Sequence, residues 1–125
     1  MRKPKTKDRT EWWVKQQVKQ ILKDTGWTFW MPSADVFGRG GVSDFLAIKR
    51  PGLFMAIETK YDDMPTPLQL KFLTDVYEAG HFAFLVDETN IDELHNFLMC
   101  GNRIVNVNLM KWQNQEAELA EKLDS

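Results

Sequence analysis

The sequence contains a single cysteine, Cys100, and it has no uninterrupted apolar run long enough to cross a membrane. One cysteine excludes an intramolecular disulfide framework and any zinc site built from several cysteines. Histidine is also scarce, and the two that are present, His81 and His95, form no metal-spaced cluster. These absences, together with a polar and basic start in place of a signal peptide, predict an intracellular protein.

The composition is that of an ordinary globular protein, with 43% hydrophobic and 27% charged residues in a chain of 125. A chain of this length can bury a core without disulfides or metals, and it predicts one domain. The net charge of -2 conceals an asymmetry, because residues 1–23 carry eight of the sixteen basic residues and two of the eighteen acidic ones. A basic beginning favours a polyanionic partner, although charge alone leaves a solvated terminus as an alternative.

Hydrophobic periodicity and turn chemistry predict alternating helices and strands. Residues 1–9 are predicted to be a flexible basic arm, and residues 10–125 a single domain. The expected elements are a helix at 10–25, strands at 27–31, 44–48 and 53–60, a helix at 67–79, a strand at 81–86, a helix at 91–99, a strand at 103–108 and a helix at 109–123. This order is typical of an α/β domain in which helices flank both faces of a mixed sheet.

The two middle strands are predicted to form a hairpin that brings Asp44 opposite Glu58. Paired positions in a hairpin sum to a constant, so a five-residue connection over 49–53 gives this register. A four-residue connection would instead place Asp44 opposite Ile57 unless a bulge restored the pairing. Lys60 lies two residues after Glu58 and therefore shares its face of the strand. Opposed carboxylates repel each other, and a divalent cation between them would remove the repulsion.

These residue types suit metal-assisted hydrolysis of a phosphodiester bond. Mg²⁺ prefers oxygen ligands, which Asp44, Glu58 and the backbone carbonyl of Thr59 could supply. Lys60 could orient or deprotonate an attacking water, or neutralise the charge that develops on the phosphate. A salt bridge at a strand end is the alternative that the spacing leaves open.

Three segments carry a resemblance to a known family: GVSDFL at 41–46, IETK at 57–60 and TPLQ at 66–69. Over about 11–87, the sequence resembles the VRR-NUC (virus-type replication-repair nuclease) family of the PD-(D/E)XK superfamily, in particular its small stand-alone phage-type members. The resemblance implies a restriction-endonuclease-like fold and a DNA nuclease that depends on Mg²⁺ or Mn²⁺. It further implies branched or nicked DNA as substrate and a homodimer. A non-catalytic nucleic-acid-binding module on the same fold is the alternative function.

Carried over position by position, the resemblance implies that Asp44 and Glu58 bind the metal and that Lys60 is the catalytic lysine. It also implies active-site roles for Gln69 and Glu11. Each of these two has a structural alternative: Gln69 can complete a capping box three residues after a threonine, and Glu11 follows an aspartate by three residues. The chain has Thr59 where many relatives carry valine, and serine before Asp44 where proline is often found.

Four basic residues are candidates for DNA contacts: Arg9, Lys15, Lys19 and Arg39. Arg39 lies in a glycine-rich loop whose backbone amides suit a phosphate, although a plain connecting loop is equally compatible. Lys15 and Lys19 would extend the basic surface of the first helix, or simply form its solvated face. The tryptophans at 12, 13, 27 and 30 are expected in the core or in a dimer interface rather than stacked on bases.

Overall fold

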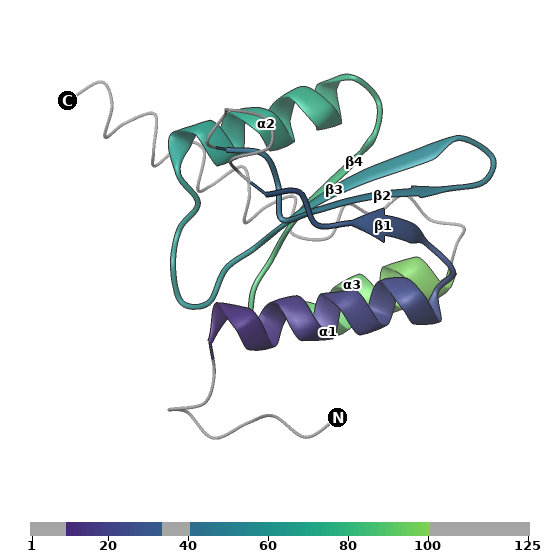
Figure 1. Ribbon diagram of the computed structural model, residues 1–125, viewed down its shortest axis with the longest axis horizontal. Coiled ribbons are helices and arrows are strands. Elements are labelled where there is room, and N and C mark those ends of the chain that lie inside the picture. The colour runs from purple at the N-terminus through teal and green to yellow at the C-terminus, as the bar shows by residue number, and fades with distance from the viewer. Residues whose placement is uncertain (1–9, 34–40, 101–125) are drawn as a thin grey trace.

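The protein is a four-stranded mixed sheet with helices on both faces, as a computed structural model describes it for residues 10–33 and 41–100 (Figure 1). The elements in chain order are α1 (Glu11–Asp24), β1 (Thr28–Trp30), β2 (Phe45–Lys49), β3 (Leu53–Thr59), α2 (Pro67–Glu78), β4 (Phe82–Val86) and α3 (Ile91–Cys100). The predicted α/β class is confirmed. The predicted arm at 1–9, strand at 103–108 and helix at 109–123 lie outside the described residues.

The sheet has the order β1-β2-β3-β4, in which β3 and β4 are parallel and the other neighbours are antiparallel. The hairpin has the register in which Ile48 pairs with Phe54 and Phe45 with Ile57, as predicted, but Lys49 and Leu53 also pair, so the connection is 50–52 rather than 49–53. The same register continued by one residue sets Asp44 opposite Glu58. Helix α2 makes the crossover between the parallel strands, which a parallel pair requires.

Two hydrophobic clusters lie on the two faces of the sheet. Helices α1 and α3 lie side by side across one face, and α2 covers β3 and β4 on the other (Figure 1). Alternation along β3 serves both faces, since Met55 and Ile57 join the α1 and α3 cluster while Ala56 joins the α2 cluster. Among the described residues, no helix combines the length and the apolar character that crossing a membrane demands.

Helix α1 begins at a threonine cap. The Thr10 side chain accepts a hydrogen bond from the backbone N–H of Trp13 at 3.3 Å. Asp8, which the sequence offers as a possible cap before Glu11, lies outside the described residues. The helix ends at Asp24, one residue before its predicted end, and Gly26 follows its C-cap with a φ of +82°, which favours glycine. Because the cap fixes the first turn, Glu11 is held in that turn, at one end of the sheet.

Helix α2 begins with a complete capping box between Thr66 and Gln69, as the sequence predicts. Its buried face is centred on Leu70 and Leu73, with Phe72 and Val76 only half-buried. The spacing of apolar residues in the sequence predicts that Phe72, Leu73, Val76 and Tyr77 share one apolar face of this helix, and for Tyr77 this is wrong. Tyr77 lies in the last turn and is 42% exposed, because the face of the helix that meets the sheet is rotated toward Leu70.

A glycine at the entry to β2 is required by a close contact with α2. Gly41 has a φ of +117°, and a Cβ there would lie 2.8 Å from the Cβ and 2.9 Å from the backbone of Leu68. We expect Gly41→Ala to lower the free energy of unfolding by roughly 2 to 4 kcal/mol, since both the backbone and the contact would be strained. Urea unfolding measures this difference.

The matched control is Gly52→Ala in the β2–β3 turn. Gly52 has a similar φ of +114° but no atom within 4 Å of the added Cβ. It should therefore show only the conformational cost, about 1 kcal/mol. Equal losses in the two variants would contradict the role assigned to the Leu68 contact.

Candidate active site

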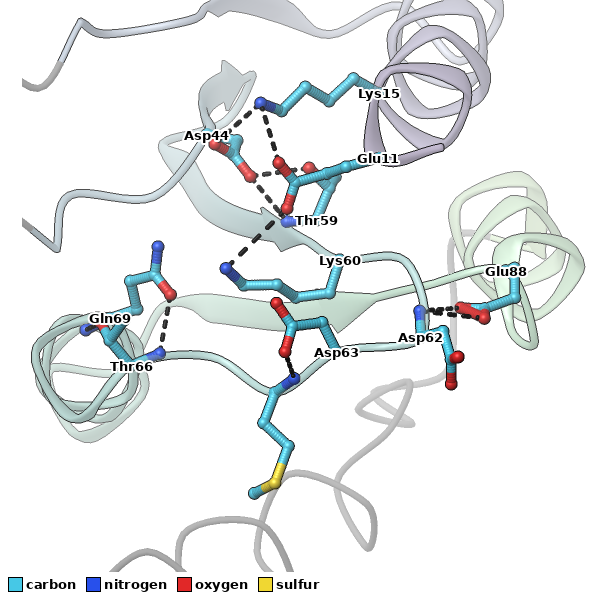
Figure 2. Close-up of polar contacts among 11 residues, drawn as sticks. Glu11, Lys15, Asp44, Thr59, Lys60, Asp62, Asp63, Thr66, Gln69 and Glu88 are labelled. Carbon is cyan, nitrogen blue, oxygen red and sulfur yellow. Dashed lines mark hydrogen bonds and ion pairs between the residues drawn. The ribbon is translucent and has the colours of Figure 1, made fainter. Parts of the chain in front are cut away.

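Charged side chains from three elements meet at one end of the sheet (Figure 2). Asp44 immediately precedes β2, Glu58 and Thr59 end β3, and Lys60 follows directly. The first turns of α1 bring Glu11 and Lys15 to the same place. The antiparallel register of β2 and β3 and the packing of α1 across the sheet therefore assemble this cluster.

Asp44 is fixed in position by Thr59. Its Oδ2 accepts hydrogen bonds from the backbone N–H of Thr59 at 2.9 Å and from the Thr59 hydroxyl at 2.6 Å. The sequence predicted only that the Thr59 carbonyl binds the metal, and it did not predict this contact. The available signal was a hydroxyl residue, in place of the relatives' valine, beside a predicted carboxylate pair. A short bond to a charged acceptor of this kind is strong and holds the carboxylate in one orientation.

Glu58 is almost fully buried, with 1% of the residue exposed. Its Oε2 is buried and has no hydrogen-bond partner within the described part of the chain. Burial, and then the negative charge of Asp44, raise the pKa of this carboxyl to about 9, while the positive charge of Lys60 opposes the rise. Without a cation, Glu58 therefore keeps its proton at neutral pH.

The Lys60 ammonium lies beside Glu11. Its Nζ is 3.8 Å from Glu11 Oε1, and the Lys60 backbone N–H donates to the carbonyl of Val86 at 2.9 Å. That backbone bond continues the β3–β4 pairing one residue beyond the strand, so the backbone from which the Lys60 side chain extends is fixed in position. Glu11 also lies 3.5 Å from the Lys15 ammonium through its Oε2.

Gln69 lies near this cluster but serves the helix cap. Its side-chain Oε1 accepts a hydrogen bond from the Thr66 backbone N–H at 2.8 Å, and its backbone N–H donates one to the Thr66 hydroxyl at 3.2 Å. Within the described residues it makes no hydrogen bond to Lys60 or to the carboxylates. The capping interpretation therefore accounts for the geometry of Gln69, and the active-site interpretation stays a prediction.

The basic candidates are placed differently from one another. Lys15 points into the cluster rather than toward solvent, whereas Lys19, one turn further along α1, is half-buried and forms no ion pair with any described residue. Arg9 and Arg39 lie outside the described residues. Of the tryptophans at 12, 13, 27 and 30, those at 13 and 27 are buried, while those at 12 and 30 are 67% and 43% exposed and lie outside the core.

The cluster fits a hard divalent cation by the chemistry of its donors. No group of three or more acidic, histidine or cysteine side chains in the described ranges is arranged as a metal site. Asp44 and Glu58 nevertheless provide two neighbouring carboxyl groups, one of them with a buried oxygen that lacks a partner among the described residues. Mg²⁺ commonly binds through one or two carboxylates and takes its other ligands from water and substrate phosphate.

The fold is similar to that of a solved VRR_NUC domain, with a TM-score of 0.59 and 22% sequence identity, over 76% of this chain and 100% of that one. No family model and no curated protein matches the sequence. The structural similarity confirms a nuclease-like fold, which is the fold that the sequence resemblance implied. At this identity it concerns the fold alone, so the chemistry rests on the residues of the cluster.

Proposed function

We propose that this protein is a divalent-metal-dependent DNA nuclease of the VRR-NUC type, which hydrolyses phosphodiester bonds with Mg²⁺ or Mn²⁺. The observation that carries the proposal is the buried Glu58 carboxyl, whose Oε2 lacks a partner beside Asp44. A buried polar atom without a partner is costly, and a surface salt bridge does not explain it. The similarity of the fold to a VRR_NUC domain supports the same assignment.

Each residue of the cluster has a distinct part in the proposed reaction. Asp44 and Glu58 would hold the cation together with the Thr59 carbonyl, and the Thr59 N–H and hydroxyl keep Asp44 oriented. A bound cation supplies polarisation of the scissile phosphate and a lower pKa for water. The Lys60 ammonium, 3.8 Å from Glu11 Oε1, would orient the attacking water or neutralise charge on the phosphate.

We propose branched or nicked DNA as the substrate and a homodimer of a phage-type protein as the active form. The sequence resemblance is the main support for the substrate. Support for a dimer comes from Trp30 and Ile48, which are 43% and 45% exposed on the paired strands β1 and β2. Light scattering of the purified protein measures the mass in solution and tests the dimer.

A cleavage assay tests the proposed activity. Labelled four-way junction, nicked duplex and linear duplex are each incubated with Mg²⁺, with Mn²⁺ and with EDTA. We expect cleavage only with a divalent cation, and faster cleavage of the branched or nicked substrates. Asp44→Asn should lose cleavage, because the amide still accepts from Thr59 but removes the charge that binds the cation.

Binding assays on the same three DNAs separate the enzyme from a binding module. Tight DNA binding without cleavage under either metal would contradict the nuclease and favour the non-catalytic alternative. If Asp44→Asn cleaves DNA at the wild-type rate, Asp44 is not a ligand of the metal. The linear duplex serves as the internal control for the substrate preference.

A further inference from the structure

The ammonium of Lys15 lies between two carboxylates of the proposed site. Its Nζ is 3.5 Å from Glu11 Oε2 and 3.6 Å from Asp44 Oδ1 (Figure 2). Glu11 and Lys15 are four residues apart, so the helix places both side chains on the same face. Lys15 was expected to contact DNA or to form part of the solvated face of α1. In the structure its ammonium is a countercharge inside the cluster, and its contact with DNA stays a prediction.

The two oxygens of Asp44 are engaged by different partners. Oδ2 receives both hydrogen bonds from Thr59, which leaves Oδ1 as the oxygen that faces a positive charge. That oxygen is the one available to a divalent cation. A cation bound there would stand within a few ångströms of the Lys15 ammonium, and like charges at that separation repel each other strongly.

We propose that Lys15 is a positioning residue that takes the place of the divalent cation on Asp44 and must leave Asp44 Oδ1 when the cation binds. The proposal rests on the proposed function for the identity of the cation. In the metal-free protein, Lys15 neutralises Asp44 and ties it to Glu11. It therefore keeps the carboxylates together before metal arrives and lowers the affinity for metal through competition.

Calorimetric titration of Mn²⁺ into the DNA-free protein tests this competition. We expect Lys15→Gln to bind Mn²⁺ roughly threefold to tenfold more tightly than the wild type, since no ion pair has to be broken. Lys15→Arg keeps the positive charge and should bind no more tightly than the wild type. In EDTA, Lys15→Gln should also melt at a lower temperature, and saturating Mn²⁺ should abolish that difference.

The matched control is Lys23→Gln, which removes the same charge from the last turn of α1, two turns beyond Lys15. It should leave the Mn²⁺ affinity unchanged, so a gain confined to Lys15→Gln excludes a general effect of net charge. Binding by Lys15→Gln alone, with none by the wild type, would support the competition as well.

Unchanged or weaker binding by Lys15→Gln, with normal binding by the wild type, would overturn this inference and leave the proposed function standing. Absence of Mn²⁺ binding in the wild type and in Lys15→Gln would overturn both.

Discussion

Replacing Glu58 with glutamine is expected to stabilise the metal-free protein by about 3 kcal/mol at pH 7. The pKa of Glu58 is about 9 in the folded protein and has the ordinary value of 4.5 when unfolded. The folded state therefore keeps a proton that the unfolded state has already released between these two pH values. Each pH unit above 4.5 costs the folded state about 1.4 kcal/mol until the folded carboxyl ionises.

The sign of this dependence is specific to a carboxyl whose pKa is raised. The stability of the wild type should be greatest below pH 4.5, as far as this group is concerned, and should fall steadily as the pH rises toward 9. Glutamine carries no proton to lose and resembles the neutral acid in shape. The Glu58→Gln variant should therefore lack this decline, and its advantage over the wild type should grow with pH.

Urea unfolding in EDTA at several pH values between 4.5 and 9 measures both effects. The control is Glu78→Gln at the exposed end of α2, where the same substitution removes an exposed carboxyl. It should leave the pH dependence of the wild type intact. Parallel stability curves for wild type and Glu58→Gln would contradict the raised pKa of Glu58.

The parts of the fold that follow from local patterns could be predicted from the sequence. The turn residues predicted the hairpin but left two registers open, and the observed pairing of Ile48 with Phe54 is the one that sets Asp44 opposite Glu58. The α2 start follows from Thr66 and the proline after it. The error at Tyr77 shows the limit of such patterns, because periodicity gives the apolar stripe of a helix but not the angle at which the stripe meets the sheet.

The contacts inside the site depend on tertiary packing and could be predicted only in part. The register predicted that Asp44 and Glu58 would meet, since both belong to one hairpin. The position of Lys15 depends on how α1 crosses the sheet, which is a long-range property. Its spacing of four residues from Glu11 was nevertheless a usable signal. Glu11 was predicted to face the body of the protein, and residues i and i+4 lie on the same face of a helix.

Replacing Lys60 with methionine is expected to reduce metal-dependent cleavage roughly 10²- to 10⁴-fold while the protein stays folded. The fold should survive because the structural contact of Lys60, the bond from its backbone N–H to Val86, does not involve the side chain. Its ion pair with Glu11 is long, at 3.8 Å, and Glu11 is 41% exposed, so the pair adds little stability. The loss should therefore appear in the rate and not in the unfolding curve.

The measurement is single-turnover cleavage of nicked DNA with Mg²⁺, alongside thermal unfolding of the same samples. Lys71→Met is the matched control, since Lys71 is an exposed lysine that pairs with Asp75 on α2, and it should cleave at the wild-type rate. Lys60→Arg separates the two roles proposed for the ammonium. Arginine keeps the charge but does not give up a proton, so partial activity would identify Lys60 as a charge that stabilises the phosphate. Cleavage at the wild-type rate by Lys60→Met would remove Lys60 from the mechanism, and the Glu58 carboxyl would then have to act without it.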